Sequence, residues 1–94
     1  MKLIWTAESF HNIEMIVEYI SSTDPVAALA LDEKIFSIVE TVLPENPYVG
    51  RPGRVEGTRE LVVHASYIVV YEIDNDINIL AVRHTARLWP NTYN

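Results

Sequence analysis

The chain has no cysteine among its 94 residues, which excludes disulfides, thiolate metal ligands and a cysteine nucleophile. Its three histidines lack the spacing of metal ligands, and no phosphate-binding glycine motif follows a predicted strand. No apolar run approaches the roughly 18 residues that a membrane span needs, and the first residues turn polar too early for a signal peptide. We therefore expect a cytoplasmic protein that uses no metal, no cofactor and no membrane.

Positive charge is scarce and unevenly placed. The net charge is −6, and residues 1–47 contain eight acidic residues but only two lysines. The acidic balance argues against broad binding of nucleic acid, which depends on cation–phosphate contacts. A local basic site in the second half is still open, because residues 48–94 balance five acidic residues with all five arginines of the chain: Arg51, Arg54, Arg59, Arg83 and Arg87.

The length and the 49% apolar content predict one folded domain over residues 1–94. Residues 2–5 form a short apolar stretch that suits a strand. Apolar residues at spacings of three and four then predict a helix over about residues 7–21. Thr23 or Asp24 can cap a second helix over about residues 25–43, in which Pro25 suits the first turn. The short link between the two helices predicts an antiparallel hairpin.

Prolines and glycines predict an irregular loop over residues 44–57, which carries Arg51 and Arg54. Three strands should follow at residues 58–64, 67–73 and 77–84, and their short connections allow only antiparallel neighbours. The second and third of these strands are apolar on both faces, so we expect them at the centre of the sheet. The fold class is therefore α+β. The helix hairpin covers one face, and the loop, the C-terminal tail or a partner must cover the other.

Arg59, Arg83 and His84 are the candidates for chemistry at the ends of this sheet. Alternation along the last strand places Arg83 on the face of Ile79 and Ala81, and His84 on the opposite face. In a simple meander Arg59 and Arg83 lie at opposite ends of the sheet, unless the loop or the tail folds back. Structural roles also fit these residues: an exposed ion pair for Arg59, and packing at a strand end for His84.

Three segments combine a glycine–arginine loop, an apolar strand and an arginine–histidine ending: GRPGRVEGTRELVV at residues 50–63, YIVVY at residues 67–71 and ILAVRHTAR at residues 79–87. With Trp5, Ala7 and Pro90, their order and spacing extend over nearly the whole chain. In these features the chain resembles the RelE/ParE superfamily of toxins from bacterial type II toxin–antitoxin modules. The resemblance implies a β-α-α-β-β-β fold whose first strand joins the sheet edge and whose helix hairpin packs on one face of a small antiparallel meander. It also implies a cognate antitoxin that covers apolar surface and blocks the active region.

The resemblance implies one of two targets. RelE-like members cut mRNA on the ribosome with several cationic residues and often a C-terminal tyrosine, whereas ParE-like members inhibit DNA gyrase without a nuclease site. Arg59 and Arg83 match positions that are commonly basic in the RelE-like branch, and His84 with Arg87 fits the His-x-x-Arg ending common among ParE-like members. The lysine-rich central loop of RelE-like enzymes is absent. The sequence therefore favours a gyrase inhibitor over an enzyme, with a ribosome-dependent mRNA endoribonuclease as the alternative.

The expected site residues differ between these two targets. A nuclease would use Arg59, Arg83 and His84 for catalysis. Contacts to gyrase, or to RNA, would use the remaining cations and the aromatic residues of the tail: Arg51, Arg54, Arg87, Trp89 and Tyr93.

A third alternative is an inactive remnant that only binds its antitoxin.

Overall fold

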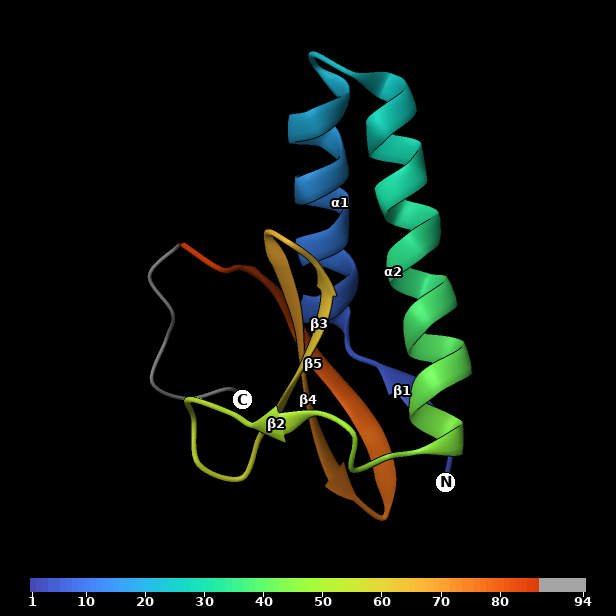
Figure 1. Ribbon diagram of the computed structural model, residues 1–94, viewed down its shortest axis with the longest axis vertical. Coiled ribbons are helices and arrows are strands. Elements are labelled where there is room, and N and C mark those ends of the chain that lie inside the picture. The colour runs from blue at the N-terminus through green and yellow to red at the C-terminus, as the bar shows by residue number, and fades with distance from the viewer. Residues whose placement is uncertain (87–94) are drawn as a thin grey trace.

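The computed structural model, which describes residues 1–86, contains two helices and a five-stranded sheet. The strand order is β1-β5-β4-β3-β2; β1 runs parallel to β5, and all other neighbours are antiparallel. Figure 1 shows the helices as a hairpin that packs on one side of the sheet and extends past its end. The expected α+β fold, with the first strand at the sheet edge, is confirmed. The elements are β1 (Leu3–Trp5), α1 (Ala7–Ser21), α2 (Pro25–Glu45), β2 (Arg51–Pro52), β3 (Arg59–His64), β4 (Tyr67–Asp74) and β5 (Asp76–His84).

Capping residues fix where the two helices begin. Thr6 and Asp24 each accept a hydrogen bond from the backbone N–H three residues later, at 3.2 and 3.0 Å. α2 continues two residues beyond its predicted end and includes Pro44. A proline in the last turn removes only one backbone hydrogen bond before the helix ends, so the helix can include it.

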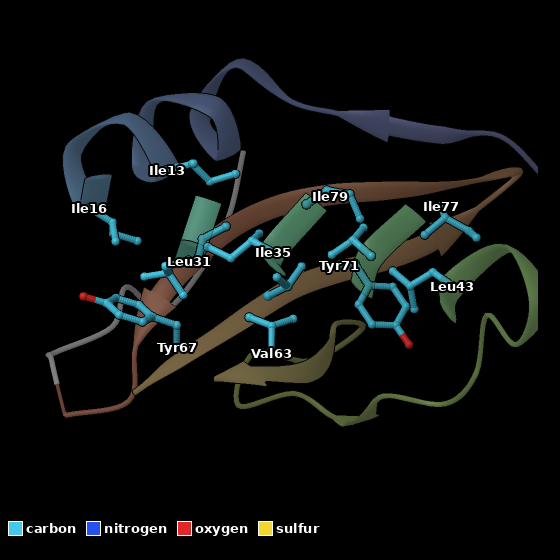
Figure 2. Packing of buried hydrophobic residues seen from close by; sticks show 13 residues of the cluster. Ile13, Ile16, Leu31, Ile35, Leu43, Val63, Tyr67, Tyr71, Ile77 and Ile79 are labelled. Carbon is cyan, nitrogen blue, oxygen red and sulfur yellow. The ribbon is translucent and has the colours of Figure 1, made fainter. Parts of the chain in front are cut away.

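The core lies between the helix hairpin and one face of the sheet (Figure 2). Each of its aliphatic side chains contributes about 1.5 to 3 kcal/mol when it leaves water, which holds the hairpin against the strands. Tyr67 lies toward one end of this core and Tyr71 lies nearer the other end, close to Leu43 (Figure 2). Polar groups lie next to each tyrosine, one set near each end of the sheet. Its members are Ile13, Ile16, Leu31, Ile35, Val39, Leu43, Val63, Tyr67, Val69, Tyr71, Ile77, Ile79 and Val82.

The central strands are buried on both faces, as expected. On β4, Val69 and Tyr71 belong to the core under the helices, and Ile68 and Val70 on the other face are each only 1% exposed. β4 lies between β3 and β5, and β5 lies between β4 and β1. Burial on both faces therefore coincides with the central positions.

A β-bulge corrects the prediction for Arg83. Tyr71 pairs with Ile79 but Val70 pairs with Ala81, so one extra residue of β5 interrupts the alternation. Arg83 consequently shares a face with Ala81 but not with Ile79. His84 lies on the face opposite to Arg83, as predicted, and this is the face of the core.

The predicted irregular loop contains a strand that the sequence analysis missed. β2 has only two residues, and they pair with Glu60 and Arg59 of β3. Pro52 lacks a backbone N–H, which a strand tolerates at the edge of a sheet, and β2 is an edge strand. This pairing fixes the loop against β3 and brings Arg51 opposite Glu60.

Candidate functional site

The structure separates the candidate residues into two groups. Arg59 pairs with Tyr71 of β4, whereas Arg83 pairs with Ile68, three residues from Tyr71 along the same strand. At about 3.3 Å per residue the two arginines are offset by about 10 Å along the strands, with β4 between them. The described chain therefore keeps Arg59 and Arg83 at different ends of the sheet. Arg87, Trp89 and Tyr93 lie outside the described residues.

Residues 46–58, which we call the arginine loop, are anchored by Tyr71. This tyrosine has no exposed surface, and its hydroxyl donates to the backbone oxygen of Pro47 at 2.7 Å. The same hydroxyl accepts from the backbone N–H of Gly50 at 2.9 Å. A Cβ atom at position 50 would lie 2.6 Å from this oxygen, so only glycine fits so close to the ring. Tyr71 therefore joins the core to the loop through two hydrogen bonds.

The environment of Tyr71 predicts a loss of stability in alkaline solution. Burial raises the pKa of Tyr71 above its ordinary value of 10.0, while the hydrogen bond from Gly50 and the charge of Arg59 oppose this rise. Above about pH 10 the unfolded chain releases the tyrosine proton and the folded protein retains it. The free energy of unfolding should therefore fall as the pH rises above 10. Urea titrations from pH 8 to pH 11 on the wild type and on Tyr71→Phe measure the effect, and an equally steep fall in both proteins would contradict it.

Arg59, at the start of β3, has a structural role and holds the arginine loop in place. Its Nη1 donates to the backbone oxygens of Gly50 and Tyr48 at 2.6 and 3.2 Å. Its guanidinium also lies 5.1 Å from the centre of the Tyr48 ring, in cation–π geometry. These contacts direct the guanidinium of Arg59 toward the loop, which it holds against β3.

Glu60 is a buried carboxylate that accepts hydrogen bonds from both arginines of the loop. It is 3% exposed, and its Oε1 accepts from Nε and Nη2 of Arg51 at 3.3 and 3.1 Å. Its Oε2 accepts from the backbone N–H of Arg54 at 2.8 Å. Three donors thus stabilise a charge that would be costly to bury alone. The residue that pairs with Glu60 is Arg51. The guanidinium of Arg59 instead bonds to backbone oxygens, whereas an exposed ion pair also fitted the sequence.

The second group of candidates lines an open pocket at the other end of the sheet. The pocket has a volume of about 330 Å³ and lies between α1 and the ends of β4 and β5. Tyr67 contributes to it and contacts His84 edge to face, with 5.2 Å between the ring centres. Arg83 also lines it and reaches Glu8 of α1, with 3.7 Å between Nη2 and Oε1. Sequence reasoning missed Tyr67 and His11, which bring further polar groups to this pocket.

The hydrogen bonds of His84 limit its chemistry. Its Nδ1 accepts from the backbone N–H of Ala86 at 3.0 Å, so the neutral ring carries its proton on Nε2. A ring in this state can donate a hydrogen bond through Nε2 but has no nitrogen ready to accept a proton. His84 would have to give up the bond to Ala86 before it acted as a general base.

Within residues 1–86, no group of three or more histidine, aspartate or glutamate side chains is arranged to hold a metal ion. No helix in this part of the chain is long and apolar enough to cross a membrane.

The fold of the described chain matches that of RelE/ParE toxins. The structure resembles a chain of the chromosomal ParDE TA system from P. aeruginosa, with a TM-score of 0.76 and 23% identity over 89% of this chain and 95% of that chain. It also resembles YafQ from E. coli strain BL21(DE3), with a TM-score of 0.59 and 12% identity over 90% of this chain and 93% of that chain.

Sequence comparison specifies the family. Residues 3–89 match the model of the ParE toxin of the type II toxin–antitoxin system parDE. The chain is 39% identical over 90 residues to protein Y4kP of Sinorhizobium fredii, covering 95% of this chain and 93% of that protein. It is 31% identical over 88 residues to toxin RelE2 of Caulobacter vibrioides, covering 93% and 98%. The chain belongs to the ParE toxin family, and it is the toxin of a type II toxin–antitoxin module. Membership of this family implies a cognate antitoxin.

Proposed function

We propose that this toxin arrests growth by inhibiting DNA gyrase in the cytoplasm, and that its antitoxin neutralises it. The observation that best supports this proposal is that Arg59 and Arg83 lie at different ends of the sheet. In addition, the guanidinium of Arg59 is bonded to the backbone oxygen of Gly50 in the arginine loop. Cleavage of RNA requires cations and an acid–base pair to converge on one phosphate. Residues that lie at different ends of the sheet do not converge in this way. An inhibitor that acts by binding a protein needs no such centre.

A supercoiling assay with purified gyrase tests this proposal. The toxin should block the conversion of relaxed plasmid to supercoiled plasmid as its concentration rises. The variant Arg83→Gln/His84→Gln removes the charge and the imidazole at the nuclease candidates, and it should inhibit within about threefold of the wild type, because no catalytic step is involved. Full supercoiling at saturating wild-type toxin would refute the proposal.

The second candidate is a ribosome-dependent mRNA endoribonuclease. One observation favours it: Arg83, His84 and Tyr67 line the same pocket, which gathers a cation and two groups capable of proton transfer. The 31% identity to a protein named toxin RelE2 points in the same direction. Under this candidate the variant Arg83→Gln/His84→Gln loses its effect on cells, whereas under gyrase inhibition it retains it.

A further inference from the structure

We propose that the exposed surface of the arginine loop is the part of this toxin that contacts its protein target, and that it fits an acidic surface on that target. The inference rests on the proposed function, since it takes gyrase as the partner. It assigns a binding role to Tyr48, Val49 and Arg54, and positioning roles to the buried residues beneath them.

The composition of this surface suits a protein interface. Tyr48 and Val49 are large apolar side chains that are 60% and 45% exposed. The side chain of Arg51 is 56% exposed, and Arg54 is exposed as well. Tyrosine and arginine dominate the binding energy of protein interfaces, because each combines a large contact area with directional hydrogen bonds. One short loop therefore presents the residue types that form interface hot spots.

The loop is held in one conformation before any partner binds. Tyr71 fixes its first part and Arg59 fixes the backbone at position 50, as described above. Glu60 fixes the side chain of Arg51 and the backbone of Arg54, and the backbone N–H of Gly53 donates to the oxygen of Thr58 at 2.7 Å. A surface that is already ordered loses little conformational entropy on binding. This explains why a buried carboxylate and a buried tyrosine hydroxyl lie beneath an exposed loop.

Charge complementarity indicates an acidic protein as the partner. The loop and the start of β3 contribute three arginines and two acidic residues, for a local charge of +1. Glu60 pairs with Arg51, and the other acidic residue is Glu56. The chain as a whole has a net charge of −6, so it repels the dense phosphates of a nucleic acid more strongly than it repels a small acidic patch on a protein. A local positive surface on an acidic protein is better suited to an acidic patch on another protein.

Direct binding to purified gyrase, measured with immobilised toxin at 50 and 200 mM salt, tests the inference. The variant Arg54→Glu should bind at least about tenfold more weakly, and its affinity should depend less on salt. The double variant Arg54→Glu/Tyr48→Ala should bind more weakly still. Matched controls on α2 are Lys34→Glu and Lys34→Glu/Val26→Ala, which change the same charge and remove exposed apolar surface at a position that is 80% exposed. The controls should bind like the wild type, and circular dichroism should show all four variants folded.

The outcomes separate this inference from the proposed function. Absence of binding by the wild-type toxin refutes gyrase as the target and the inference with it. Wild-type binding that the loop variants and the controls retain equally refutes the loop surface alone. If Arg54→Glu keeps its affinity for gyrase but loses affinity for a single-stranded RNA oligonucleotide, the loop contacts RNA and the inference is overturned.

Discussion

Replacing Gly50 by alanine should lower the free energy of unfolding by about 3 kcal/mol, the upper end of the usual cost of overpacking a buried site. The new Cβ would lie 2.6 Å from the Tyr71 hydroxyl oxygen and 2.7 Å from its Cε1 atom. Tyr71 has no exposed surface, so its ring cannot move aside without disturbing the core. The clash should also break the hydrogen bond between Gly50 and Tyr71 and release the start of the arginine loop. Urea denaturation at pH 7 measures the loss.

Gly57→Ala is the matched control for this substitution. Gly57 has a φ of +84°, and no atom lies within 4 Å of a Cβ built there. Its replacement therefore introduces backbone strain without a clash, at a cost of about 1 kcal/mol. If Gly50→Ala is no more destabilised than Gly57→Ala, the close packing of Gly50 on Tyr71 does not contribute to the free energy of unfolding.

Replacing Tyr71 by phenylalanine should cost about 2 kcal/mol of folding free energy. The substitution keeps the ring in the core but removes the hydroxyl that bonds the backbone of Pro47 and Gly50. A buried donor or acceptor that loses its partner costs about 1 to 3 kcal/mol, and relaxation of the loop recovers part of this loss. Chemical denaturation gives the stability, and amide hydrogen exchange at Gly50 should become faster.

Tyr48→Phe is the control for the loss of a tyrosine hydroxyl in the same loop. Tyr48 is 60% exposed, so we expect a change within about 0.5 kcal/mol. Equal stability losses in the two variants would mean that the Tyr71 hydroxyl has no special part in anchoring the loop.

The sequence predicted the helices and the long strands well because their patterns are local. α1 matches its predicted bounds, and the three strands of the meander lie within one residue of theirs. β2 was missed because two residues, one of them Pro52, carry no periodic signal. The prediction that Arg83 shares a face with Ile79 was wrong because of a β-bulge. A bulge depends on the pairing with the partner strand, which alternation along one strand does not reveal.

The candidate site was predicted less completely, since its contacts join distant parts of the chain. The partner of Glu60 is Arg51, nine positions away, and their contact depends on the pairing of β2 with β3. Tyr71 did carry a signal, because a tyrosine within an apolar central strand needs a partner for its hydroxyl. The sequence alone did not indicate that this partner would be the backbone of residues 47 and 50.

Expression of the toxin without its antitoxin, with plasmid topology and mRNA ends read from the same cultures, tests gyrase inhibition most directly. We expect growth arrest, altered plasmid supercoiling and intact mRNA, and Arg83→Gln/His84→Gln should still arrest growth. Growth arrest with codon-phased mRNA cuts and unchanged supercoiling, lost in Arg83→Gln/His84→Gln, would contradict gyrase inhibition and identify the pocket beside Tyr67 as a nuclease centre.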